Sequence, residues 1–144
     1  MNSVGINCFP VDSESLEVNG LNIYNAIVGT VLYNNTSGEA SNVLLSDSVA
    51  NYTYIEVFYC DNNGNGYSSV KVYQANGKNI DLSIVEAGGT LGYTYIRRTG
   101  YDISTTSIVP QTANMGYALI TGNTVSTTTG TNYLRIVRVV GYKL

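Results

Sequence analysis

The sequence predicts an all-β fold, an antiparallel β-sandwich of the jelly-roll kind with about ten short strands. Apolar and polar residues alternate along most segments, which is the period of a strand that buries one face. Gly and Asn residues that favour turns separate these segments. No stretch keeps an apolar period of about 3.6 residues over three turns, so long helices are not expected.

The expected strands follow one another from residue 24 to the end of the chain. Asn76-Gly77 and Gly122-Asn123 are turn signals between neighbouring strands. Pro110 is expected to end the strand before it, because proline cannot donate to a sheet ladder. The expected strands span residues 24–33, 42–46, 51–60, 67–74, 79–86, 91–99, 103–109, 115–121, 124–129 and 132–144.

One domain is expected, because a chain of 144 residues can bury about two-thirds of its unfolded surface. Residues 25–144 form the expected sandwich, a single head domain. Residues 1–24 are less regular and carry Pro10, and in this part residues 12–18 have the one pattern compatible with a helical turn. This N-terminal segment is interpreted as an edge strand or as the end of a stalk.

The composition predicts a neutral surface rich in hydrogen-bonding groups. Only 12% of residues are charged, against about 25% in an average domain, and tyrosine occurs 13 times. The net charge of −3 argues against a nucleic-acid partner, and no run approaches the length needed for membrane insertion. Histidine is absent, which removes every Ser-His and Cys-His dyad and favours a protein that is not an enzyme and has no cofactor.

Acidic and basic residues are unevenly distributed between the two halves of the chain. Residues 1–70 hold seven acidic residues and no Lys or Arg, whereas residues 71–144 hold three acidic and all seven basic residues. Two arrangements explain this pattern: strands from both halves pair so that the charges interleave, or subunits meet head to tail. The first arrangement is favoured.

The two cysteines, Cys8 and Cys60, match no zinc-ligand spacing, and zinc would need two further ligands. Met1 is followed by no basic region and no apolar stretch, so no signal peptide is expected. Two buried free thiols are therefore favoured over a disulfide, although the sequence alone leaves their pairing open.

The sequence DNNGNG raises the question of a calcium site, because it begins like an EF-hand loop. Four of its residues fit positions 1, 3, 5 and 6 of such a loop: Asp61, Asn63, Asn65 and Gly66. Position 12 must supply a bidentate glutamate and is Val72 here, and strand patterns flank the loop in place of helices. We therefore expect a hairpin turn and no metal, with amides that suit a sugar better than a cation.

Paired carboxylates are the enzymatic alternative, because glycosidases need two acids about 5–10 Å apart in a cleft. Glu56 lies in mid-strand between Ile55 and Val57 and is the candidate acid. An exposed or paired side chain is nevertheless favoured at this position.

The densest polar and aromatic patch lies around the sequence RRTGYD at residues 97–102. Tyrosines offer aromatic faces with polar tips, and arginine forms bidentate hydrogen bonds, a combination that suits sugars. Tyrosine is also an ordinary strand residue, so each one has a structural explanation too. The candidate ligand-binding residues are Tyr93, Tyr95, Arg97, Tyr101 and Asp102.

Four stretches in order, GTVLYNN, VLLSDSVANYTYIEVFY, SSVKVYQANGK and LRIVRVVGYK, carry a resemblance to a known family. They resemble the C-terminal domains of tail-fibre, baseplate and minor structural proteins from phages and prophages of Gram-positive and gut bacteria. The resemblance covers roughly residues 27–86 and 132–143, and not the middle of the chain. These stretches are strand patterns, so no binding residue is transferred from the family.

The resemblance implies an all-β head domain, usually a homotrimer, that attaches a virion to a bacterial surface saccharide. It implies other phage tail or baseplate proteins as partners, and a location at the tail tip or baseplate after synthesis in the host cytoplasm. A structural or trimerisation tip domain without a ligand is the alternative, and a virion-associated glycan hydrolase is a third hypothesis. Within a receptor-binding domain, we expect the contacts in the middle region, at the candidate residues given above.

Overall fold

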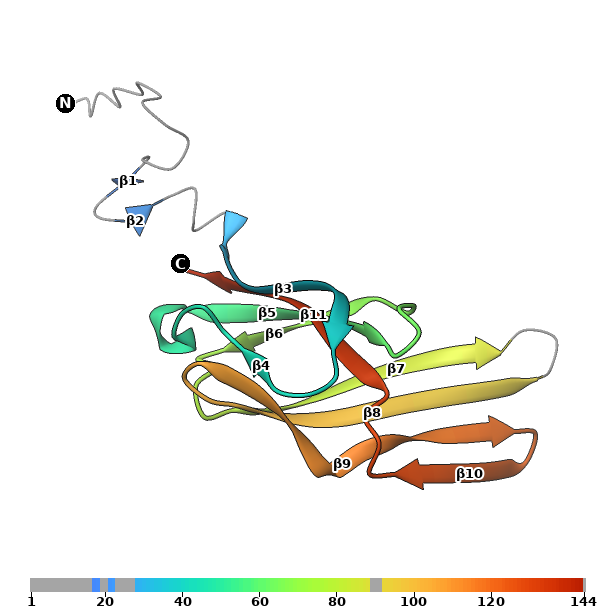
Figure 1. The fold of residues 1–144 in the computed structure, drawn as a ribbon. Helices are drawn as coiled ribbons and strands as arrows, with labels where there is room; N and C mark the ends of the chain where they lie inside the picture. Colours follow the sequence, from blue (N-terminus) through green and yellow to red (C-terminus); the bar gives the residue numbers. More distant parts are fainter. Residues whose placement is uncertain (1–16, 19–20, 23–27, 89–91, 144) are drawn as a thin grey trace, which may run out of the picture.

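The computed structural model describes residues 17–18, 21–22, 28–88 and 92–143. Most of these residues form two antiparallel sheets stacked on each other, which confirms the predicted all-β sandwich (Figure 1). Val49–Asn51 forms a short 3-10 turn, and no helix among the described residues is long and apolar enough to cross a membrane. Most of the expected N-terminal segment, including Cys8, lies outside the described residues, whereas Cys60 is a buried free thiol.

The first sheet has the strand order β3-β11-β5-β6, so the last strand of the chain lies between two early ones. Its strands are β3 (Thr30–Glu39), β11 (Leu134–Tyr142), β5 (Tyr54–Asp61) and β6 (Ser68–Tyr73). Pairing of early and late strands mixes the acidic and basic halves of the chain. Glu56, for example, lies opposite Lys71 and accepts a hydrogen bond from the Ser69 hydroxyl at 2.8 Å, as expected for a paired side chain.

The second sheet has the order β10-β9-β8-β7, and a two-residue strand, β4, pairs with the start of β9. Its strands are β7 (Asn79–Gly88), β8 (Tyr93–Ile103), β9 (Ser107–Thr121), β10 (Thr124–Thr129) and β4 (Val43–Leu44). Two further two-residue strands, β1 (Glu17–Val18) and β2 (Leu21–Asn22), pair with each other.

The hydrophobic core lies between the two sheets. In β5, every second residue faces this core, and Ile55, Val57 and Tyr59 are all buried. Leu82 and Ile84 are buried on the corresponding face of β7. Burial of each such side chain contributes about 1.5–3 kcal/mol, so this alternation of apolar residues is the main source of the sandwich's stability.

The predicted break at Pro110 is wrong, because β9 runs through it as one strand of 15 residues. Pro110 lies opposite Tyr101, and the pairing of β8 with β9 shifts register between Thr99 and Tyr101. A proline is tolerated at such an irregularity, where the ladder loses its regular hydrogen bonds in any case. The expected strands 103–109 and 115–121 therefore merge into β9, and β8 extends to Ile103.

Residues 34–39 also belong to a strand, where the sequence predicts a break. They form the second half of β3, whose register with β11 is irregular between Asn34 and Glu39. Gly38 within this stretch has a positive φ of 73°, and a side chain there would meet Cβ of Arg135 at 2.6 Å. The turn-forming residues thus bend the strand without ending it.

One end of the second sheet extends beyond the first. Figure 1 shows β7, β8, β9 and β10 running past the tip of the β5–β6 hairpin. Along the inward face of β8, Thr99 is fully buried, Arg97 is 8% exposed, and Tyr95 and Tyr93 are only half-buried. The inward face of the sheet is therefore open at this end, and its side chains form the wall of a groove.

Candidate functional site

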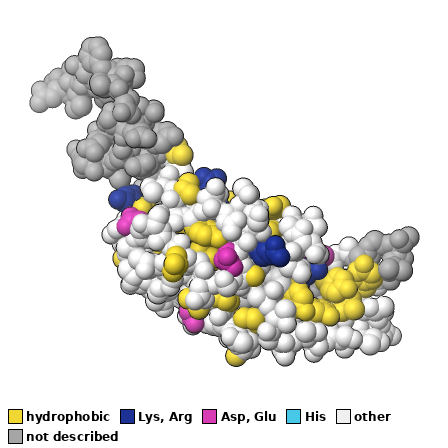
Figure 2. Space-filling view, in the orientation of Figure 1, with side chains coloured by type: hydrophobic (Ala, Val, Ile, Leu, Met, Phe, Trp, Pro, Cys, Tyr) yellow, Lys and Arg dark blue, Asp and Glu magenta, His cyan; other side chains and the backbone are white. Residues whose placement is uncertain are grey.

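Four tyrosine rings line this open face of the second sheet. Tyr93 and Tyr95 come from β8, Tyr117 from β9, and Tyr133 from the segment that leads into β11. Successive rings meet edge to face, with centroids 5.3, 5.7 and 4.9 Å apart along the row. Each such pair contributes about 0.5–1.5 kcal/mol in addition to the stabilisation from the apolar area that it buries, so the four rings hold one another in place. Figure 2 shows hydrophobic side chains, a class that includes tyrosine, gathered over the ends of β7 and β8.

Arg97 links the aromatic wall to the end of β5. Its guanidinium lies 5.3 Å from the ring centroid of Tyr95. Its Nη1 donates to Oδ2 of Asp61 at 3.0 Å and also to Oε2 of Glu86. Asp61 is 1% exposed and belongs to the first sheet, whereas Arg97 and Glu86 belong to the second. This ion network therefore joins the two sheets beside the groove, and it pairs an acid of the first half of the chain with a base of the second.

The DNNGNG segment is the hairpin turn that the sequence predicts, between β5 and β6. Oδ1 of Asp61 accepts the backbone N–H of Asn63 at 2.9 Å and of Asn65 at 2.6 Å. Gly64 and Gly66 take positive φ values of 80° and 61°, which glycine adopts without strain. In the part of the chain that the structure describes, no group of three or more His, Cys, Asp or Glu side chains is placed to hold a metal ion.

The two carboxyl groups of the ion network have pKa values shifted in opposite directions. Burial by itself raises the pKa of Asp61, but the N–H groups of Asn65 and Asn63, the Glu86 carboxyl and the charge of Arg97 together hold it below its usual value. Burial, and then the neighbouring carboxyl of Asp61, raise the pKa of Glu86. As the pH falls, Glu86 therefore takes up a proton before Asp61 does, and Asp61 remains the ionised partner of Arg97.

The groove has two adjoining compartments on either side of Tyr95. One has a volume of about 230 Å³ and is lined also by Asn62, Tyr117 and Tyr133. The other has a volume of about 390 Å³ and is lined also by Glu86 and Tyr93. Asn63, Tyr95 and Arg97 line both compartments, so they form one continuous site.

Asn62 contributes an unsatisfied polar atom to the wall of this site. Its backbone N–H donates to the carbonyl of Tyr133 at 2.9 Å, which fixes the turn against the tyrosine row. Its side-chain Oδ1, however, is buried with no hydrogen-bond partner among the described residues. An unpaired buried acceptor costs about 1–3 kcal/mol, so a donor brought into the groove would relieve this cost once the amide turns towards it.

The five sequence-predicted site residues separate into two groups. Tyr93, Tyr95 and Arg97 lie together in the groove. Tyr101 is fully buried in the core, where its hydroxyl donates to the Leu134 carbonyl at 3.4 Å and burial raises its pKa to about 12. Asp102 is exposed and accepts a hydrogen bond from Gln111 outside the groove. The five residues therefore do not form one site: the first sheet covers Tyr101, which leaves it no exposed surface for a ligand, and Asp102 lies outside the groove.

Several residues that line the groove are not among those predicted from the sequence. Tyr117 and Tyr133 lie far from RRTGYD in the sequence and reach the site only through strand pairing and the β10–β11 connection. Asn62 and Asn63 are the exception, because the turn that holds them is predicted to present amides to a sugar. Glu86 has no sequence signal, because its role follows from its register opposite Tyr95.

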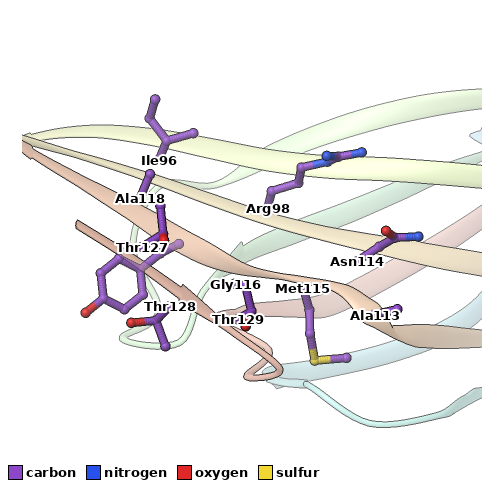
Figure 3. Close-up of a pocket in the computed structure, with 11 residues that line it drawn as sticks. Ile96, Arg98, Ala113, Asn114, Met115, Gly116, Ala118, Thr127, Thr128 and Thr129 are labelled. Carbon is purple, nitrogen blue, oxygen red and sulfur yellow. The ribbon is translucent and has the colours of Figure 1, made fainter. Parts of the chain in front are cut away.

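A second depression, of about 300 Å³, lies along β8, β9 and β10 (Figure 3). Ile96 and Arg98 of β8, Met115 of β9 and Thr127 of β10 line it. Arg98 forms an exposed ion pair with Asp81 at 2.9 Å. Of the four tyrosines only Tyr117 lines this depression, and neither Arg97 nor Glu86 does, so the inward groove is the stronger candidate site. Comparison of the chain with protein-family models, with curated proteins and with solved structures finds no significant match.

Proposed function

We propose that this chain is a non-enzymatic receptor-binding domain of a phage tail fibre or baseplate, which attaches the virion to a bacterial surface saccharide. The groove on the inward face of the second sheet is the proposed saccharide site. Support for the phage context comes from the resemblance of residues 27–86 and 132–143 to such tail domains. A homotrimer at the tail tip, in contact with other tail or baseplate proteins, is part of this proposal.

The observation that carries the saccharide proposal is the row of four tyrosines beside the unpaired acceptor of Asn62. Aromatic faces stack against the C–H face of a sugar ring, and amides and ionised groups meet its hydroxyls. Tyrosine suits recognition because it gives a large contact area at a small cost in side-chain entropy. The two compartments on either side of Tyr95 suit an oligosaccharide of more than one ring.

Binding is favoured over hydrolysis by the surroundings of Asp61 and Glu56. A glycosidase needs one carboxylate that is free to act on the substrate or on a water molecule. Asp61 is buried, and its oxygens are already occupied by two backbone N–H groups and by Arg97. Glu56, the acid proposed from the sequence, lies on β5 beside Lys71 and Ser69, away from the groove.

A glycan array together with adsorption to host cells tests the proposal. We expect the purified chain to bind a bacterial oligosaccharide and to compete with virions for the host surface. Blank results in both assays would contradict receptor binding and favour the structural tip domain. Release of reducing ends from host wall polysaccharide would instead support the hydrolase.

The charge of the groove predicts a preference for neutral sugars over acidic ones. Asp61 and Glu86 oppose the single guanidinium of Arg97, so ionised Glu86 gives the groove an excess negative charge. We expect Glu86→Gln to strengthen binding of an oligosaccharide that carries a uronic acid by on the order of tenfold, because like charges repel at close range. Binding of its neutral counterpart should change little, as measured by isothermal titration calorimetry.

Asp81→Asn is the matched control for Glu86→Gln, because Asp81 is an exposed acid on the outward side of the same strand. It should leave both affinities unchanged. Equal binding of the acidic and neutral oligosaccharides by the unmodified chain would show that Glu86 does not discriminate between them.

A further inference from the structure

Three Asn-Gly pairs lie in loops of the described structure, and such a pair is open to a spontaneous backbone reaction. The backbone nitrogen of the glycine attacks the side-chain carbonyl carbon of the asparagine, because glycine has no side chain to hinder the approach. The new C–N bond closes a cyclic imide, the bond to the side-chain nitrogen breaks, and ammonia leaves with the proton that the glycine nitrogen loses. Water then opens the imide to aspartate or isoaspartate. The three pairs are Asn63-Gly64, Asn65-Gly66 and Asn76-Gly77.

The hydrogen bond of the glycine N–H distinguishes the three pairs. The N–H of Gly64 donates to the carbonyl of Asp61 at 3.1 Å, and the N–H of Gly77 donates to the carbonyl of Ile103 at 2.9 Å. Each of these bonds must break before the nitrogen is free to attack. The N–H of Gly66 donates to no group among the described residues. The nitrogen of Gly66 can therefore react without a prior loss of structure.

The Asn65-Gly66 pair is exposed, and it also holds the turn in place. Exposure gives water free access to the pair. The φ of Gly66 is 61°, a value that favours glycine, so the turn itself calls for the reactive residue. The N–H of Asn65 donates to Oδ1 of Asp61 at 2.6 Å, and its carbonyl accepts the N–H of Asp61 at 2.9 Å. A change of the backbone at Asn65 therefore reaches Asp61 directly.

Both products place a new carboxylate beside the ion network of Asp61, Arg97 and Glu86. In isoaspartate the chain continues through the side-chain carbon, so the carbonyl that accepts the Asp61 N–H becomes a free carboxylate. In aspartate the carboxylate replaces the side-chain amide of Asn65. Glu86 is close to the same point, since a Cβ on Gly66 would lie 3.5 Å from its Oε1. A third carboxylate would then lie near the guanidinium that Asp61 and Glu86 already share.

We propose that Asn65 is a site of spontaneous conversion to aspartate and isoaspartate, which slowly adds negative charge to this ion network beside the groove. The reaction consumes only water, and its rate rises with pH because the glycine nitrogen attacks after it has lost its proton. In the folded chain, Asn63 and Asn76 should convert roughly two- to tenfold more slowly, because one hydrogen bond must break first. This inference concerns the chain itself and does not depend on the saccharide.

Peptide mapping by mass spectrometry, over a time course of storage at mildly alkaline pH, tests the site. We expect conversion first at Asn65, and fragment masses assign each product to its residue. The same chain unfolded in guanidinium chloride is the control: its three pairs should convert at similar rates, because the hydrogen bonds that protect Asn63 and Asn76 are lost. Asn65→Gln should abolish the fast conversion and leave the slower ones unchanged, because glutamine must close a larger ring.

Urea unfolding of the stored samples, followed by circular dichroism, measures the effect on the ion network. The converted chain should unfold at a lower urea concentration than the fresh chain, whereas stored Asn65→Gln should keep its fresh midpoint. Two results would overturn the site: folded-state conversion at Asn65 no faster than at Asn63 and Asn76, or a preference for Asn65 that persists in the unfolded chain. An unchanged midpoint after conversion of Asn65 would overturn its link to the ion network.

Discussion

Arg97→Ala is expected to lower the free energy of unfolding by about 3–5 kcal/mol, because it leaves a buried carboxylate without its counter-charge. Asp61 is 1% exposed, and its Oδ2 lies 3.0 Å from Nη1 of Arg97. The pair also joins the two sheets, so its loss weakens their contact at the groove. Urea unfolding followed by circular dichroism measures the effect as a shift of the transition midpoint at constant slope.

Two further variants separate this effect from a general loss of an arginine. Arg98→Ala removes the neighbouring arginine, whose ion pair with Asp81 is exposed to solvent, and should barely change the midpoint. Asp61→Asn in the Arg97→Ala background should recover part of the loss, because asparagine still accepts the turn's N–H groups but carries no charge. If Arg97→Ala were as stable as Arg98→Ala, the ion network would not hold the sheets together.

This role changes the interpretation of Arg97 that the sequence suggests. An arginine among tyrosines is expected to bind a ligand through its guanidinium. In the structure the guanidinium is already bonded to Asp61 and Glu86, so it positions the groove more than it contacts a ligand. Loss of binding in Arg97→Ala would therefore be difficult to separate from loss of the fold.

The fold class was predictable because alternation of apolar residues is a local property. Ile55, Val57 and Tyr59 are buried where their two-residue period places them. Strand ends were less predictable, because they depend on pairing partners. Pro110 ends a strand in most sheets but is accommodated here opposite a register shift that no local pattern reveals.

The site was predictable only in part, for a similar reason. Tyr95 and Tyr101 belong to the same predicted ligand-binding patch, yet Tyr95 lines a groove and Tyr101 is fully buried. The difference depends on where the first sheet stops covering the second, which is set by the length of the β5–β6 hairpin relative to β7–β10. Tyr117 and Tyr133 enter the site through long-range pairing, which a single sequence does not show.

Tyr95→Ala is expected to weaken glycan binding by about 2 kcal/mol or more, roughly 30-fold in Kd, if the groove is the saccharide site. Tyr95 lines both compartments, and its ring centroid lies 5.3 Å from that of Tyr93 and 5.7 Å from that of Tyr117. Its removal would merge the compartments and leave the row interrupted at its centre. The fold should persist, because Tyr95 is only half-buried and lies at the open end of the sheet. Isothermal titration calorimetry with the best oligosaccharide from the array measures the change.

Tyr95→Phe tests whether the ring or the hydroxyl of Tyr95 contributes the binding energy, and Asp102→Ala is the control outside the groove. Tyr95→Phe keeps the ring, so preserved affinity would assign the energy to stacking, and a loss equal to that of Tyr95→Ala would assign it to the hydroxyl. Asp102 is exposed outside the groove, and Asp102→Ala should bind like the unmodified chain. If Asp102→Ala lost binding while Tyr95→Ala retained it, the saccharide would bind elsewhere and the groove would be rejected. We therefore expect substitutions in the tyrosine row to change affinity, and substitutions in the buried ion network to change stability.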